Sequence, residues 1–204
     1  MNSGIIWIMN HKNNIERIRI VHNSLEELQD RVVYVGGSTV SLYADREAFE
    51  VRETDDIDAI VETVNYPEHT RFEEQLLSKG FSNDIKSNIR CRYKISGITV
   101  DIMPTEDIAM GFRNQWYTAG FKNAIHYQID ASTIIKILSA PYFIASKLEA
   151  FNNRGGSDGR TSRDFEDIVY VFENRSGIWN EMQNSDGILK SYLVNEFREK
   201  LSNP

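Results

Sequence analysis

Three aspartates are the strongest candidates for chemistry in this sequence. Asp56 and Asp58 are separated by one residue in the run 56–61, and Asp101 lies between apolar residues in the run 99–103. If 56–61 is a strand, its alternation directs both carboxylates to one face. Adjacent like charges repel each other, and a divalent cation such as Mg²⁺ would remove this repulsion because it prefers carboxylate oxygens. All three residues are therefore candidate metal ligands and candidate catalytic residues.

Each carboxylate also has a structural interpretation. Asp56 and Asp58 could lie on a solvated strand face, since the neighbouring residues Glu53 and Asp55 show that this region accepts acidic side chains. Asp101 could form a cross-strand ion pair with a basic residue opposite it. The residue types alone leave both interpretations open.

A glycine-rich turn is the second candidate site. The β-branched run 31–35 ends at Gly36-Gly37-Ser38, after which a short helix is expected through Tyr43. Glycines let a backbone approach a phosphate closely, and the first turn of a helix offers unpaired N–H groups. Gly36, Gly37 and Ser38 are therefore candidate nucleotide-binding residues, although a simple tight turn would have the same sequence.

Residues 89–103 have the clearest strand pattern. The alternating runs 89–95 and 98–103 flank Ser96-Gly97, a typical two-residue hairpin turn. In this register Arg92 faces Asp101, and directly paired residues share one face of a sheet. One face is apolar and suited to a core: Cys91, Tyr93, Ile95, Ile98, Val100 and Ile102. The other face is polar: Arg90, Arg92, Lys94, Thr99, Asp101 and Met103.

Four basic residues are candidates for contacts with phosphate groups. Arg92 and Lys94 share a face with Asp101, and they would neutralise a phosphate bound there or simply offset an acidic surface. Lys147 and Arg154 are seven residues apart, so they share one face of the helix expected there. A solvated helix face is the alternative for this second pair.

The combination of these motifs resembles the polymerase-β-like nucleotidyltransferase superfamily. The resemblance rests on Gly36-Gly37-Ser38, on Asp56-x-Asp58 and on Asp101 between valine and isoleucine. Within the superfamily the chain looks most like the AbiEii-type nucleotidyltransferase toxins. Residues 52–58 have their Arg-x-Thr-x-Asp-x-Asp form, and residues 147–167 resemble their helical Lys…Arg…Asp region. The likeness spans roughly residues 32–175, and the long interval between Ser38 and Asp56 departs from the pattern.

The resemblance implies a reaction and its participants. It implies transfer of a nucleoside monophosphate from ATP or another NTP to a hydroxyl acceptor, with Mg²⁺ or Mn²⁺ bound by the three aspartates. It also implies that Lys147 reaches the nucleotide phosphates, that tRNA or a protein is the acceptor, and that a cognate antitoxin is a partner. Two other hypotheses remain open: a catalytically silent nucleotide- or partner-binding protein of the same fold, and an antibiotic nucleotidyltransferase.

The expected elements place these residues in an α/β (α+β) fold. We expect a small mixed β-sheet core flanked by helices over residues 1–139, followed by a helical subdomain over residues 140–204. The strands are expected at 31–35, 56–61, 89–95, 98–103, 124–130 and 132–138. The main helices are expected at 14–30, 67–79, 141–153, 162–173 and from there to about 201. Residues 44–54 form a polar loop, and Thr161 and Asp164 match a capping box at the start of the second C-terminal helix.

Composition limits the classes of function. The 204 residues carry a formal net charge of −7, which disfavours a general nucleic-acid coat because such proteins need clustered Lys and Arg. A lone cysteine, Cys91, excludes an internal disulfide and is expected to pack in the core. The four histidines lack metal-ligand spacing. No segment has the length of a membrane span, so we expect a cytoplasmic protein.

Overall fold

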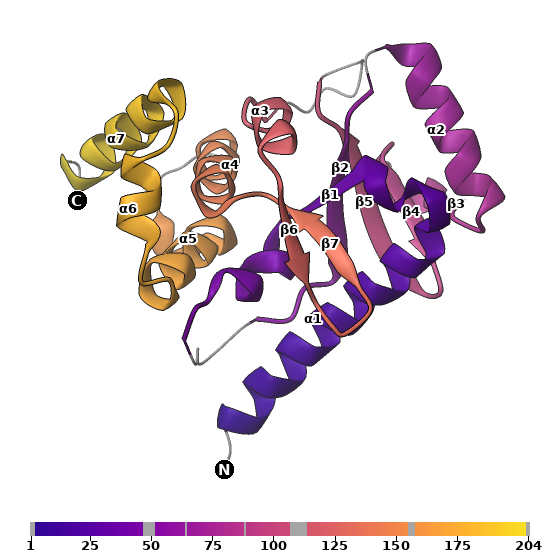
Figure 1. Ribbon diagram of the computed structural model, residues 1–204, viewed down its shortest axis with the longest axis horizontal. Helices are drawn as coiled ribbons and strands as arrows, with labels where there is room; N and C mark the ends of the chain where they lie inside the picture. Colours follow the sequence, from indigo (N-terminus) through magenta and orange to yellow (C-terminus); the bar gives the residue numbers. More distant parts are fainter. Residues whose placement is uncertain are drawn as a thin grey trace.

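A seven-stranded mixed sheet organises the protein (Figure 1). The computed structural model describes residues 3–46, 52–63, 65–87, 89–106, 114–154 and 158–202, without the side chains of residues 3–10 and 201. Within these ranges the strand order is β3-β4-β5-β2-β1-β7-β6. The strands are β1 Val32–Val35, β2 Asp56–Val61, β3 Ser82–Asn83, β4 Arg92–Ile95, β5 Ile98–Pro104, β6 Ile125–Gln128 and β7 Ile134–Ile137. The predicted α/β class is confirmed.

The centre of the sheet carries the candidate site. β2 pairs antiparallel with β1 and parallel with β5, and β1 also pairs parallel with β7. β1 is buried throughout, and β2 is buried at Ile57, Ala59 and its last two residues. A strand buried on both faces favours such β-branched runs. The predicted alternation of β2, with its two aspartates on the opposite face from Ile57 and Ala59, is confirmed.

The predicted hairpin and its register are confirmed. Arg92 pairs with Asp101, and Ile95 pairs with Ile98. The turn residues Ser96 and Gly97 have φ angles of 51° and 79°, the left-handed values that a type I′ turn requires at both positions. The expectation for Cys91 was wrong: it precedes β4, is only partly buried and lines the cavity described below.

The N-terminal part of the chain contributes helices that flank the sheet. α1 (Ser3–Leu25) starts earlier than predicted and is continued by a 3₁₀ helix over Glu26–Arg31. Figure 1 shows α1 crossing one face of the sheet, where Ile18 and Val21 are fully buried. α2 (Tyr66–Ser78) begins one residue before the predicted start at Pro67, which lies in its first turn, and the Asn65 side chain accepts a hydrogen bond from the Glu68 backbone N–H. None of the helices in the described part of the chain is long and apolar enough to cross a membrane.

From α4 onward the described part of the chain is helical, as predicted. The helices there are α4 Ala140–Asn153, α5 Arg163–Asn174, α6 Ile178–Gln183 and α7 Gly187–Ser202; the short α3 (Tyr117–Lys122), which was not predicted, precedes β6 and β7. Figure 1 shows α4 to α7 gathered at the opposite end of the molecule from α2. α4 is largely buried, with Phe143, Ile144 and Leu148 at 0% exposure. The division into 1–139 and 140–204 remains a prediction.

Two short segments differ from their predictions. The helix after the glycine turn is a 3₁₀ helix over Gly37–Tyr43, and all its residues are buried. The capping box at α5 was wrong: Ser162 is the N-cap and accepts from the Phe165 N–H, which leaves Asp164 available for other contacts. Of the predicted polar loop 44–54, residues 47–51 lie outside the described ranges.

Candidate active site

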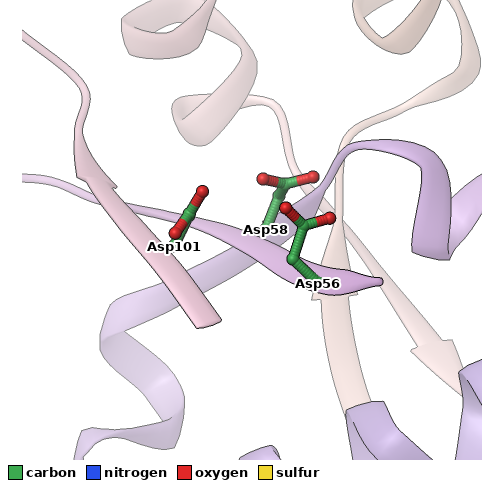
Figure 2. A group of neighbouring side chains, drawn as sticks. All are labelled: Asp56, Asp58 and Asp101. Atoms are coloured by element: carbon green, nitrogen blue, oxygen red, sulfur yellow. The ribbon is translucent and has the colours of Figure 1, made fainter. Parts of the chain in front are cut away.

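The three aspartates come together on β2 and β5. The parallel pairing of these strands sets Asp58 opposite Asp101, and Asp56 follows the same face of β2. Figure 2 shows the three carboxylates clustered on this face. Each residue offers one oxygen, and these oxygens all lie within 4.8 Å of one another. Asp101 is 9% exposed, whereas Asp56 and Asp58 are partly buried.

This donor set fits a divalent cation. Three carboxylates at this separation supply the oxygen ligands that Mg²⁺ or Mn²⁺ prefers. Burial, together with the charge of Asp56, raises the pKa of Asp58 to about 7. The charge repulsion behind part of that shift is the conflict that a bound cation relieves.

Arg92 contacts two of the three carboxylates. Its Nε and Nη2 donate to Oδ1 and Oδ2 of Asp101, both at 2.7 Å, and Nη2 also donates to Oδ2 of Asp56 at 3.1 Å. The hydrogen bonds to Asp101 raise the pKa of Arg92. The cross-strand ion pair and the carboxylate cluster, proposed from the sequence as alternatives, therefore exist together.

The glycine turn lies against the cluster. Gly36 has φ 72° and ψ −171°, a combination accessible to glycine, and a Cβ added there would overlap Oδ2 of Asp58. A Cβ at Gly37 would overlap the guanidinium of Arg52. Both glycines line the cavity. Ser38 is fully buried beneath them and does not line it, because the tight 3₁₀ turn directs its side chain inward.

Lys147 is buried in an ion-pair network behind the turn. Its Nζ lies 2.7 Å from Oδ2 of Asp167 and 3.2 Å from Oδ1 of Asp164, and the residue is 7% exposed. Burial alone would lower the pKa of Lys147, but the two carboxylates outweigh it and raise that pKa. The alternative of a solvated helix face is therefore wrong for Lys147.

Arg52 and Arg154 complete this network. Nε and Nη2 of Arg52 donate to the two oxygens of Asp167 at 3.2 and 3.0 Å. Arg154 pairs with Asp164, so the predicted shared face of Lys147 and Arg154 places both near one carboxylate. The network links the segment before β2 to α4 and α5, through residues 115 positions apart in the case of Arg52 and Asp167.

A cavity of about 840 Å³ joins the carboxylate cluster to the ion-pair network. Among the described residues, six cationic ones line it: Arg52, Arg90, Arg92, Lys147, Arg154 and Arg163. Four acidic ones line it: Asp56, Asp58, Asp101 and Asp164. These described lining residues carry a formal charge of +2, within a chain of net charge −7. Lys94 is not among the lining residues; it is half-exposed and pairs with Asp84 at 3.1 Å.

Several lining residues are not candidate site residues on sequence grounds. Arg52 and Thr54 belong to the Arg-x-Thr-x-Asp-x-Asp motif without a predicted contact, and Asp164 has the sequence context of a helix cap. Tyr117 begins α3, a helix that the sequence did not predict, and Arg163 begins α5, whose start was predicted but which gave Arg163 no role. The motif at 52–58 marks Arg52, and the charged region 147–167 marks Asp164, whereas no sequence motif includes Tyr117.

Comparison with known proteins shows which solved structures share this fold. No protein-family model matches this sequence, and no curated protein matches it. The antigenic nucleotidyltransferase-like protein from Paracoccidioides brasiliensis aligns with a TM-score of 0.55 at 15% identity, over 91% of this chain and 88% of that one. The antibiotic-resistance factor ANT(2'')-Ia aligns with a TM-score of 0.54 at 13% identity, over 94% of this chain and 96% of that one. This chain therefore has the fold of nucleotidyltransferase-like proteins.

Proposed function

We propose that this protein is a Mg²⁺-dependent nucleotidyltransferase that moves a nucleoside monophosphate from an NTP to a hydroxyl acceptor. The observation that carries the proposal is the cluster of Asp56, Asp58 and Asp101 on two neighbouring strands, within one cavity and against a glycine turn. The fold of nucleotidyltransferase-like proteins supports the same reaction class.

The chain's own residues have separable roles in this proposal. Mg²⁺ or Mn²⁺, held by the three aspartates, would supply positive charge to the attacking and leaving oxygens. Gly36 and Gly37 allow the backbone to approach a triphosphate closely. Lys147, Arg52 and Arg154 neutralise the phosphate groups and are held in place by Asp164 and Asp167.

Two of the sequence-based candidates have weaker support in this role. Ser38 is buried without lining the cavity, and its hydroxyl has no hydrogen-bond partner among the described residues. Lys94 faces Asp84 beyond the cavity rim. We therefore assign phosphate contacts to Gly36, Gly37, Lys147 and Arg154 before these two.

The charge of the cavity bears on the acceptor. A lining of formal charge +2 favours an anionic acceptor, such as the 3′ end of a tRNA, over a polycationic antibiotic. This preference agrees with the resemblance to AbiEii-type toxins, for which a tRNA or protein acceptor and a cognate antitoxin are expected. An antibiotic nucleotidyltransferase is the second candidate, favoured by the structural likeness to ANT(2'')-Ia.

A labelling experiment tests the reaction and the acceptor together. The protein is incubated with Mg²⁺ and each of four α-³²P NTPs, in separate reactions with total RNA, total protein or an aminoglycoside. Asp56→Ala/Asp58→Ala protein is the control. RNA or protein labelled only by the wild type would support the proposal, and label on the aminoglycoside alone would select the second candidate. Mg²⁺-dependent NTP binding without labelling of any acceptor would instead indicate a binding protein of the same fold.

A further inference from the structure

Arg92 fills the position between two carboxylates that a bridging cation would otherwise take. Its Nη2 lies 3.1 Å from Oδ2 of Asp56 and 2.7 Å from Oδ2 of Asp101. Its Nε takes the remaining oxygen of Asp101 at 2.7 Å. A metal ion bridging the same two oxygens would need to approach each to about 2.1 Å, in the volume that the guanidinium occupies.

The backbone holds Arg92 at this position. Arg92 is directly opposite Asp101 in the β4–β5 ladder, and the type I′ turn at Ser96 and Gly97 sets that register. A guanidinium keeps its charge at any physiological pH, and its planar fork matches a carboxylate through two parallel hydrogen bonds. The side chain is 22% exposed, so little of this contact competes with solvent.

We propose that Arg92 is a built-in cation of the carboxylate cluster, so that the chain binds one divalent ion where two would otherwise fit. The inference rests on the proposed function, because it concerns the same metal site. The three aspartates hold this single ion, and only Asp56 and Asp101 also accept from Arg92, since the described hydrogen bonds of Arg92 do not include Asp58. The positive charge of Arg92 takes the role of a second ion beside Asp101.

The stoichiometry of Mn²⁺ binding tests this without measuring activity. Mn²⁺ is titrated into the full-length protein without nucleotide, and bound and free ions are counted by electron paramagnetic resonance. We expect one Mn²⁺ per chain in the wild type and two in Arg92→Gln, because removing the nearby positive charge lets a second ion bind. Arg163→Gln removes the same charge from the cavity lining away from the carboxylate contacts, and we expect it to bind one ion.

The outcomes separate this inference from the proposed function. Two ions bound by the wild type, or one ion bound by a folded Arg92→Gln protein, would overturn the role of Arg92 while leaving nucleotidyl transfer intact in the labelling assay. No Mn²⁺ bound by the wild type, together with no labelling, would overturn both. If Arg92→Gln fails to fold, Arg92→Lys keeps the test open: a charge is retained, and binding of two ions by that variant would contradict the inference.

Discussion

The carboxylate of Asp58 lies directly against the backbone of Gly36, where β1 ends. Strand pairing sets Val35 opposite Asp58, and the next residue turns the chain across the carboxylate. A Cβ at Gly36 would overlap Oδ2 of Asp58. The glycine is therefore required twice, once for its positive φ and once for the space that Asp58 fills.

Gly36→Ala should disrupt the carboxylate cluster as well as the turn. We expect a loss of roughly 1–3 kcal/mol in the free energy of unfolding from backbone strain, and more from displacement of Asp58. The measurements are urea denaturation and Mn²⁺ affinity. Gly97→Ala is the matched control. Gly97 also has a positive φ, but no atom lies within 4 Å of a Cβ added there. It should lose only about 1–2 kcal/mol and retain Mn²⁺ affinity; equal loss of affinity in both would contradict the role of Gly36.

Lys147→Met should destabilise the fold through the two carboxylates that it leaves behind. Asp167 is 1% exposed and Asp164 is 4% exposed. Removing one partner from a buried ion pair costs about 3–5 kcal/mol when the other charge is left alone, and we expect the lower end of this range because Asp167 keeps Arg52 and Asp164 keeps Arg154. Urea denaturation measures the change. Lys122→Met makes the same substitution in the exposed pair with Glu62, and should cost less than about 1 kcal/mol. Similar losses for both variants would show that the network around Lys147 is not structural.

The affinity for Mn²⁺ should depend on pH through Asp58. Its pKa is raised from 3.8 to about 7 by burial and by Asp56, so the metal-free protein keeps a proton there that the ion must displace. Affinity should therefore rise by up to about tenfold per pH unit below 7 and level off above it. Calorimetry in two buffers of different ionisation enthalpy would detect the released proton. Asp58→Asn is the control, and an unchanged pH profile in that variant would place the titration elsewhere.

The same shift predicts how metal-free stability changes with pH. A carboxyl whose folded pKa exceeds its ordinary value binds more protons in the folded state than in the unfolded state between 3.8 and about 7. The contribution of Asp58 to stability is thus fully present at low pH and is lost as pH rises through this window. Urea denaturation of wild type and Asp58→Asn at pH 5 and pH 7.5 measures it. The difference between the two proteins should grow at the higher pH, in favour of the variant.

Arg52→Lys should weaken nucleotide binding more than it weakens the fold. The Arg52 guanidinium spans Asp167 and the backbone of Gly37, and a lysine cannot keep the two-pronged contact. We expect KM for the NTP to rise by roughly tenfold, with a smaller change in kcat. Arg160→Lys, in an exposed pair with Asp158, should change neither constant. An unchanged KM in Arg52→Lys would remove Arg52 from the nucleotide site.

Local patterns were sufficient for much of the fold. The hairpin register followed from alternation on both sides of Ser96-Gly97, because a slip of one residue would expose the apolar face. The helices beginning near Pro67 and Pro141 followed from proline at the first turn and from apolar spacing. These signals lie within a few residues of each other, so they needed no knowledge of the rest of the chain.

Side-chain direction at single positions was not predictable in the same way. Lys94 shares a face with Arg92, but it lies two residues further along β4, about 6.8 Å away, and meets Asp84 instead of the cluster. Ser38 follows two cavity-lining glycines, yet the 3₁₀ turn buries its hydroxyl. In both cases the outcome depends on the neighbours that packing brings near.

The sequence by itself determined that Asp56 and Asp58 share one face of a strand and that Asp101 lies on the polar face of the hairpin, because alternation along a strand sets the face from which each carboxylate projects. The tertiary structure alone decided their surroundings. It brought Arg52 to Asp167 across 115 positions, and it turned Asp164 from an expected cap into a partner of Lys147. Strand periodicity acts over a few residues, whereas contacts between distant segments depend on how helices and sheet pack, which no local pattern encodes.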